Sequence, residues 1–250
     1  MIDLHCHILP RVDDGSGGMR ETITILEKAV DAGIDTICFT PHYAEPQYLN
    51  TKSQNQEVLE QVRARVNNQN IQLKLLLGNE VFIRPDIQNL LENGEISTLA
   101  DSQYVLIEVP MFQELAQEVV QKMLNDVKQK GFKVVIAHPE RYTYIQKNPN
   151  KLLEYFGDDV FFQANYGSII GVYGRDAQKT IKKLLNDKVI HYFASDVHHR
   201  NRCFYDAFNE IKKKMLKIVD KDYFEILTEI NPRLVIENKN LIKDIENGKE

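Results

Sequence analysis

Met1-Ile2-Asp3-Leu4-His5-Cys6-His7, the first seven residues, carry the pattern from which the fold can be inferred. Apolar and polar residues alternate from Ile2 to His7, which is typical of a short strand, and this strand ends in two histidines. Successive side chains of a strand point to opposite faces, so His5 and His7 project to the same side. Two neutral imidazoles directed at one point are ligands for zinc, manganese or iron. On these residues alone, two solvated histidines on an edge strand remain the alternative.

The same pattern, an apolar run that ends in a polar side chain, returns along the chain between amphipathic helical segments. Further strands are expected at 34–40, 71–77, 104–110, 133–137, 160–164 and 189–194. Helices are expected at 19–32, 52–69, 86–92, 113–130 and 175–187. From about Cys203 the sequence is typical of helix, with a break expected near Asn231-Pro232, because proline lacks a backbone N–H.

Seven strands that alternate with helices predict a parallel sheet, and their apolar character at nearly every position predicts burial on both faces. A closed (β/α) barrel is the simplest arrangement, and in such barrels the loops after the strands form the active face. The alternative is an open doubly wound sheet. That arrangement favours a phosphate-binding GxGxxG after a strand, and the sequence has none there.

Composition limits the functional classes. The 250 residues include 43% hydrophobic and 27% charged residues, which suits one large α/β domain spanning 1–250. The net charge of -5 argues against a nucleic-acid groove as the main surface. We find neither a signal peptide nor an apolar run long enough for membrane insertion. Three cysteines without framework spacing favour a reducing cytoplasm.

Histidines and carboxylates recur where the expected strands end. Nine candidate ligands stand at or near these ends: His5, His7, Asp14, His42, Glu80, Glu108, His138, Asp196 and His198. Histidines scattered at random would not gather at one face of a barrel. Nine donors exceed what one ion with about four to six ligands can use. The pattern therefore indicates two or three neighbouring ions, with a carboxylate such as Glu80 between them.

The motifs HCH, TPHY, GNE, IEVP, AHPER and SDVH, in this order, resemble those of the polymerase and histidinol phosphatase (PHP) superfamily. The resemblance implies a distorted (β/α)7 barrel with a trinuclear metal site. Within that superfamily, MIDLHCHILPRVDDGSG, AHPERY and QANYGSIIG are similar to the CpsB/YwqE-type bacterial protein tyrosine phosphatases. The similarity extends from the first residue to about residue 210.

The resemblance also implies roles for single residues. It assigns three ligand sets: His5, His7, Glu80 and Asp196; Glu80, Glu108 and His138; and Asp14, His42 and His198. It implies that Arg141 binds the phosphate. The second phosphate-binding arginine of the family is expected seven residues after Asp196, where this chain has Cys203. A one-residue deletion would make Arg202 the counterpart, with Arg200 as the alternative.

Hydrolysis of a phosphate monoester needs positive charge and an activated nucleophile, and clustered divalent ions supply both. By the resemblance, a metal-bridging hydroxide is the nucleophile, and arginine neutralises phosphate oxygens. Imidazole mixed with carboxylate favours Mn2+, with Fe, Zn and Mg as alternatives. A cysteine nucleophile is a weaker alternative, because Cys6 to Arg11 falls one residue short of the CxxxxxR spacing of classical tyrosine phosphatases.

The function that the resemblance implies is dephosphorylation of phosphotyrosine, with a bacterial tyrosine kinase that controls capsule or exopolysaccharide synthesis as the partner. A small-molecule phosphatase of the histidinol-phosphate type is one alternative. A metal-binding regulatory scaffold with little turnover is another. Three tyrosines near the expected active face are candidates to stack on a substrate ring: Tyr142, Tyr144 and Tyr166. The sequence leaves the oligomeric state and the general acid open.

Overall fold

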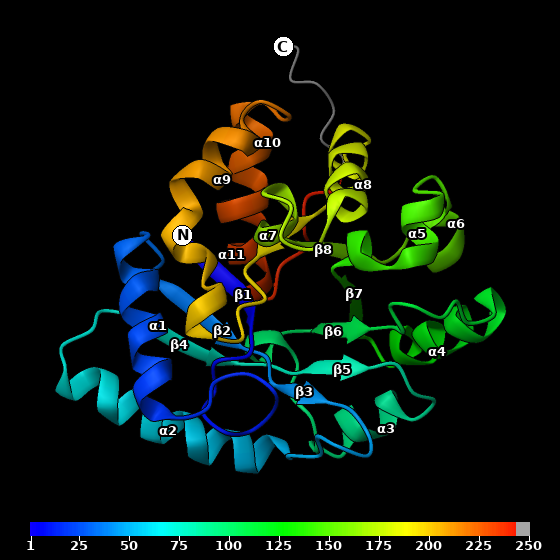
Figure 1. Ribbon diagram of the computed structural model, residues 1–250. Helices are drawn as coiled ribbons and strands as arrows, with labels where there is room; N and C mark the ends of the chain where they lie inside the picture. Colours follow the sequence, from blue (N-terminus) through cyan, green and yellow to red (C-terminus); the bar gives the residue numbers. More distant parts are fainter. Residues whose placement is uncertain (244–250) are drawn as a thin grey trace.

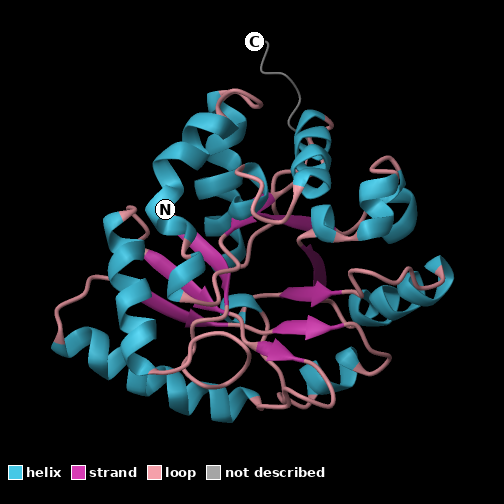
Figure 2. Cartoon of the chain, in the orientation of Figure 1, coloured by secondary structure: helices cyan, strands magenta, loops and turns pink. Residues whose placement is uncertain are grey.

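The structure is a computed structural model that describes residues 1–243. Strands lie at the centre of the molecule and helices surround them (Figures 1 and 2). The strands are β1 (Ile2–Cys6), β2 (Thr36–Phe39), β3 (His42–Tyr43), β4 (Lys74–Leu77), β5 (Glu80–Phe82), β6 (Tyr104–Glu108), β7 (Lys133–Ala137), β8 (Phe161–Asn165) and β9 (Tyr192–Ala194).

The helices occupy the segments between the strands and the C-terminal part of the described chain. They are α1 (Met19–Asp31), α2 (Lys52–Asn68), α3 (Ile87–Glu92), α4 (Gln117–Gln129), α5 (Thr143–Lys147), α6 (Lys151–Phe156), α7 (Tyr166–Ile169), α8 (Arg175–Asn186), α9 (Phe208–Met215), α10 (Lys221–Glu225) and α11 (Asn231–Ile236).

All strand pairs within the sheets are parallel, as the alternation of strands and helices predicts. One sheet has the order β1-β2-β4, and the other has the order β3-β5-β6-β7-β8-β9. β3 follows β2 after two residues, and β5 follows β4 after two residues. The two sheets are therefore consecutive pieces of the same chain segments, interrupted at equivalent positions.

Pro41 and Asn79 mark these interruptions. Proline has no N–H to donate to a ladder, so pairing stops at Pro41. The Asn79 side chain takes over part of the lost pairing: its Nδ2 donates to the Pro41 carbonyl at 2.9 Å and its Oδ1 accepts from the Ser97 N–H at 2.8 Å. Side-chain hydrogen bonds thus satisfy buried backbone groups where the strands separate.

The carboxyl ends of β1 and β9 also meet. The Asp196 N–H donates to the His5 carbonyl and the His7 N–H donates to the Val197 carbonyl, each at 2.8 Å. We predicted one closed barrel from the sequence. Within residues 1–243 the strands instead form two parallel sheets, because the ladder breaks at the two interruptions. The prediction of a parallel α/β fold is confirmed, whereas a closed barrel is not shown.

Two expected element boundaries differ from the structure. α4 begins at Gln117 rather than near residue 113, because the preceding loop is tied elsewhere: the Met111 carbonyl accepts from the Thr143 N–H at 2.8 Å. Near Pro232 the helix continues instead of breaking. A π-helical turn over Ile226–Ile230 widens the backbone immediately before α11, which accommodates the missing N–H of the proline.

The apolar strands pack against the inner faces of the surrounding helices. β6 and β8 are buried at every position, and α8 buries Ile181 and Leu184 against the sheet side of the molecule. This leaves the carboxyl ends of the strands as the place where polar side chains collect. Within residues 1–243, no helix combines the length and the apolar character that a membrane crossing requires.

Candidate metal centre

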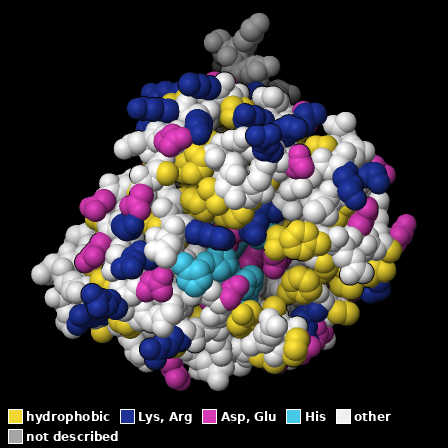
Figure 3. Space-filling model, in the orientation of Figure 1, with side chains coloured by type: hydrophobic (Ala, Val, Ile, Leu, Met, Phe, Trp, Pro, Cys, Tyr) yellow, Lys and Arg dark blue, Asp and Glu magenta, His cyan; other side chains and the backbone are white. Residues whose placement is uncertain are grey.

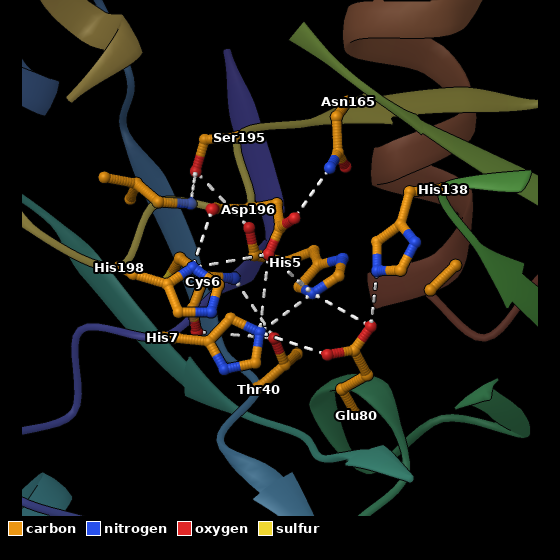
Figure 4. Close-up of polar contacts among 12 residues, drawn as sticks. His5, Cys6, His7, Thr40, Glu80, His138, Asn165, Ser195, Asp196 and His198 are labelled. Atoms are coloured by element: carbon orange, nitrogen blue, oxygen red, sulfur yellow. Dashed lines mark hydrogen bonds and ion pairs between the residues drawn. The ribbon is translucent and has the colours of Figure 1, made fainter. Parts of the chain in front are cut away.

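The nine predicted ligands lie together, and Figure 4 shows six of them, His5, His7, Glu80, His138, Asp196 and His198, in one cluster. Their donor atoms form four overlapping groups in which all atoms lie within 4.8 Å of one another. The groups are His7, Asp14, His42 and His198; His5, Glu80 and His138; His5, His7 and Asp196; and His42, Glu80 and Glu108. Part of the histidine surface is visible near the centre of one face, between carboxylates and cationic side chains (Figure 3).

Glu80 is the central carboxylate. Its oxygens lie 3.5 Å from His5 Nε2, 3.2 Å from His7 Nε2, 3.1 Å from His42 Nδ1 and 2.9 Å from His138 Nε2. The side chain is 1% exposed. A buried carboxylate within reach of four imidazoles is suited to bridge two cations.

The two histidines of the opening stretch are fixed by partners behind them. His5 Nδ1 donates to Gln163 Oε1, and His7 Nδ1 donates to Asp13 Oδ2, each at 2.8 Å. The proton of each ring is therefore on Nδ1, which leaves the two Nε2 lone pairs facing each other at 3.0 Å. Two lone pairs at this distance require a positive charge between them, either a proton or a metal ion.

Asp13 is a supporting residue that our sequence reasoning missed. It is adjacent to the predicted ligand Asp14, but its carboxylate points inward and also accepts from the His42 N–H at 3.0 Å. Gly15 makes this possible, because a Cβ at that position would lie 1.6 Å from the His7 carbonyl oxygen. The close approach of the loop to His7 thus requires glycine.

Asp196 is held from several sides. Its carboxylate accepts from Asn165 Nδ2 and from an Arg141 Nη, each at 2.6 Å, and lies 3.4 Å from His5 Nε2. The backbone is left-handed at Asp196 (φ 52°) and at His138 (φ 33°). This conformation is uncommon outside glycine, although Asp and His tolerate it better than most residues. It turns both side chains toward the cluster where their strands end.

Asp14, His42 and His198 form the exposed part of the cluster. Their side chains are 51%, 15% and 26% exposed, respectively. Asp14 Oδ1 lies 3.6 Å from His42 Nε2 and 3.7 Å from His198 Nε2. His198 Nδ1 donates to the Asp196 carbonyl at 3.0 Å, which leaves its Nε2 available to a cation.

The carboxylates of the cluster differ in charge state. Burial raises the pKa of Glu80, but His5 and other imidazoles offset this and hold it well below its usual range. Burial also raises the pKa of Asp196, and His5 and Arg141 again reverse the effect. The pKa of Glu108 is raised well above its usual range by burial and by these two negative neighbours. Glu80 and Asp196 are therefore ionised at neutral pH.

The histidines of the cluster also differ in charge state. Burial lowers the pKa of His7, but the adjacent Asp13 raises it well above its ordinary value. Burial and the neighbouring His7 lower the pKa of His42 to about 4. Burial likewise lowers the pKa of His138 and of His198. Three of these imidazoles are thus neutral at neutral pH, the state in which imidazole binds a metal.

Divalent cations fit this donor set. Buried imidazole nitrogens and ionised carboxylate oxygens converge, and His42 Nδ1, 3.1 Å from a Glu80 oxygen, is buried without a hydrogen bond. Such a cluster is costly unless positive charge enters it. Imidazole with carboxylate suits manganese, iron and zinc, and the hard oxygen donors also accept magnesium.

Arg141 and Arg202 line a cavity of about 250 Å³ beside the cluster. Asp14, Asp196 and His198 line the same cavity, so it opens directly onto the candidate ligands. Arg200 lines a separate surface pocket. Of the two arginines that the sequence left open, Arg202 is the one beside the site.

The structure argues against two other interpretations of single residues. The three tyrosines considered for substrate stacking are packed in the hydrophobic core and none of them lines the cavity beside the cluster, so that suggestion was wrong. Cys6 is fully buried, and burial with the nearby Asp3 raises the pKa of its thiol well above the usual range. A thiol held in this state is a poor nucleophile.

The chain matches the family model described as "Capsular polysaccharide synthesis, CpsB/CapC" over residues 1–237. It is 32% identical to the tyrosine-protein phosphatase YwqE of Bacillus subtilis over 248 residues, which cover 97% of this chain and 94% of that protein. It is 30% identical to CapC of Staphylococcus aureus over 253 residues, which cover 98% of this chain and 94% of that protein.

Among solved structures, the chain is similar to one described as "Crystal structures of YwqE from Bacillus subtilis and CpsB from Streptococcus pneumoniae, unique metal-dependent tyrosine phosphatases". The TM-score is 0.89 at 30% sequence identity, and the superposition covers 98% of this chain and 97% of the other. The sequence and structural similarities extend over nearly the whole chain. It therefore belongs to the CpsB/CapC family of capsular polysaccharide synthesis proteins.

Proposed function

We propose that this chain is a metal-dependent protein tyrosine phosphatase. One observation carries the proposal: a buried cluster of imidazoles and ionised carboxylates opens onto a cavity lined by Arg141 and Arg202. Relatives of the same family are named tyrosine-protein phosphatases, and the similar solved structure is described as metal-dependent.

The residues divide the work of phosphate hydrolysis. Divalent ions bound at the cluster would neutralise the phosphate and lower the pKa of water. Glu80 and Asp196 supply the negative charge that holds the cations. Arg141, fixed by its bond to Asp196, presents a planar fork to two phosphate oxygens. Arg202 lines the same cavity from the short 3-10 helix Arg200–Arg202 and completes the neutralisation.

Our proposal includes three ions, with Mn2+ as the preferred one and Fe, Zn or Mg as alternatives. The four overlapping donor groups support more than one ion, because a single ion cannot use nine donors. The proposed ligands are those predicted from the sequence: His5, His7, Asp14, His42, Glu80, Glu108, His138, Asp196 and His198.

For the biological setting, we propose that a phosphotyrosine-bearing protein is the substrate and that a bacterial tyrosine kinase of capsule synthesis is this partner. The CpsB/CapC family description supports the link to capsule synthesis. Three buried free cysteines support a reducing cytoplasm as the site of action. We further propose that the chain is one PHP-type domain, with the two sheets as halves of a distorted (β/α)7 barrel.

A side-by-side assay tests the function. Purified protein is stripped with a chelator, reloaded with Mn2+, Fe2+, Zn2+ or Mg2+, and assayed on a phosphotyrosine peptide and on histidinol phosphate. We expect chelation to abolish hydrolysis of the peptide, Mn2+ to restore it best, and thiol alkylation to have little effect. Preference for histidinol phosphate would favour the small-molecule alternative. Loaded protein without turnover on either substrate would favour a regulatory scaffold.

A further inference from the structure

We propose that Tyr173 and Phe204 form an aromatic wall that binds the phenyl ring of the phosphotyrosine substrate, an inference that rests on the proposed function. Both side chains line the cavity that also contains Arg141, Arg202 and the candidate ligands Asp196 and His198. The cavity therefore offers cation ligands at one side, arginines for the phosphate, and aromatic surface next to them.

The wall is a defined arrangement of two rings. The ring centroids of Tyr173 and Phe204 lie 6.1 Å apart at 63°, an edge-to-face geometry that aromatic pairs favour. Phe204 is 7% exposed, so its position is fixed by packing, whereas Tyr173 is half-buried. Hydrophobic surface borders the histidines on this face of the molecule (Figure 3).

Gly167, at the start of α7, shapes the wall. A Cβ at this position would lie 2.8 Å from Phe204 Cζ and 2.9 Å from Tyr173 Cε2, so both rings pack directly against the glycine. Any larger residue would push at least one ring away. The backbone after β8 thus sets where the two rings stand.

Tyr173 also connects the wall to the phosphate-binding group. The Arg141 guanidinium lies over the Tyr173 ring, with Cζ 4.3 Å from the ring centroid. One face of the arginine is thereby covered, and its bond to Asp196 fixes one edge. A phosphate bound by Arg141 consequently has its ester oxygen near aromatic surface, where a phenyl group gains contact that an alkyl group does not.

This geometry selects by the group that bears the phosphate. A cavity of about 250 Å³ is smaller than the sites of drug-sized ligands, and it suits a single ring with its phosphate. Phosphoserine would place only a methylene beside the wall. We infer that the wall favours aryl over alkyl phosphate esters, and that the discrimination lies mainly in KM.

The test compares two peptides that differ only in phosphotyrosine or phosphoserine, with Mn2+-loaded protein and metal content checked. Phe204→Leu should raise KM for the phosphotyrosine peptide about tenfold, the size expected for loss of an aromatic contact, and leave the phosphoserine peptide unchanged. Phe204→Tyr keeps the ring and should retain the preference. Gly167→Ala removes no ring but displaces at least one, and should lower the preference as well.

Phe208→Leu is the matched control. Phe208 lies in the same segment, is 6% exposed and packs edge-to-face on Tyr166 without lining the cavity. Phe208→Leu removes the same volume as Phe204→Leu, so it should lower thermal stability without changing the ratio of the KM values for the two peptides. An equal change of the ratio in Phe208→Leu and Phe204→Leu would overturn the wall, and so would an unchanged ratio in Phe204→Leu.

A binding measurement separates this inference from the proposed function. Calorimetry with phenylphosphonate and methylphosphonate, which are not hydrolysed, should show about tenfold tighter binding of the phenyl compound to the wild type and a smaller difference for Phe204→Leu, which keeps only the Tyr173 ring. If the wild type shows this difference but no hydrolysis, the proposed function fails and the wall stands. If it hydrolyses phosphotyrosine but binds both compounds equally, the wall fails alone.

Discussion

The candidate metal centre has two parts that differ in how firmly the fold holds them. The inner part consists of His5, His7, Glu80, His138 and Asp196, each at most 2% exposed by its side chain. The outer part consists of Asp14, His42 and His198, whose side chains are 15% to 51% exposed, and Glu108, at 10%, lies between the two parts. The inner residues stand at strand ends, whereas Asp14 and His198 stand in loops.

Support behind the ligands differs as well. In the inner part, Gln163 and Asp13 fix the rings of His5 and His7, and Asn165 fixes Asp196. Asp14 has no comparable partner among the described contacts of residues 1–243 beyond the two imidazoles it faces. Ligands held by such supporting bonds bind cations more tightly, because their side chains lose less conformational entropy when the cation binds. We therefore expect inner cations to be retained and an outer cation to exchange.

Glu80→Ala should have the largest effect. Glu80 contacts both parts, so its loss should remove cations from both and lower kcat by at least about a thousandfold. Asp14→Ala is the matched carboxylate control and should lose only the outer cation, with a smaller fall in kcat. Elemental analysis beside steady-state kinetics measures both. An unchanged metal count in Glu80→Ala would remove the basis for a bridging carboxylate.

Arg141→Ala should come next. Because the charged bidentate contact is lost, kcat/KM on a phosphotyrosine peptide should fall by about 30-fold to 1,000-fold, with higher KM and the metals still in place. Arg202 is exposed on the outer side, so Arg202→Ala should lower kcat/KM less than Arg141→Ala. Arg200→Ala should lower it least of all. Kinetics of the three variants measures this order. A large fall in kcat/KM for Arg200→Ala together with wild-type kinetics for Arg202→Ala would mean that Arg200, not Arg202, is the second phosphate-binding arginine.

Asp13→Ala should show that supporting bonds matter to the inner part. Loss of the acceptor behind His7 frees the ring, and changes of this kind cost about 10-fold to 100-fold in metal affinity or activity. Thr24→Ala, at a half-buried position of α1, is a control for the neighbouring helix. Metal affinity measured by competition with a chelator should fall in Asp13→Ala alone. Wild-type affinity in that variant would mean that the His7 ring is fixed without it.

The pH dependence of cation binding should also separate the two parts, with the smallest effect. The pKa of His7 is raised in the metal-free protein, so a cation must displace a proton, and inner affinity should rise with pH by up to about tenfold per unit below that pKa. The pKa of His42 is lowered to about 4 and that of His198 is also lowered, so neither ring has to release a proton above pH 6 and outer affinity should depend less on pH. Titration calorimetry in two buffers measures the released protons. Proton release confined to the weaker site would contradict this.

Much of the site could be predicted because single strands carry local information. An apolar run followed by histidine or carboxylate identifies His5, His42 and Glu80 without knowledge of the fold, since parallel strands present their carboxyl ends at one edge. The nine candidate ligands come together as expected. The division of the strands into two sheets depends on tertiary bonds such as those of Asn79, which no periodicity reveals.

What could not be predicted depends on orientation. Asp13 and Asp14 are chemically identical neighbours, and only the packing of Gly15 on His7 turns one inward as support and the other outward as a candidate ligand. The tyrosines near strand ends looked equally suitable for a substrate ring. The structure buries Tyr142 in the core and brings Tyr173, from a loop without any motif that we singled out, to the cavity.

Anomalous diffraction at the manganese edge can locate the cations of the inner and outer parts separately. Crystals grown with Mn2+ are measured before and after a short soak in chelator. We predict manganese peaks among the side chains of the inner part that persist through the soak, and a peak between Asp14, His42 and His198 that disappears. Absence of manganese from the inner part, or an outer peak that outlasts the inner ones, would show that the inner part does not hold its cations more firmly.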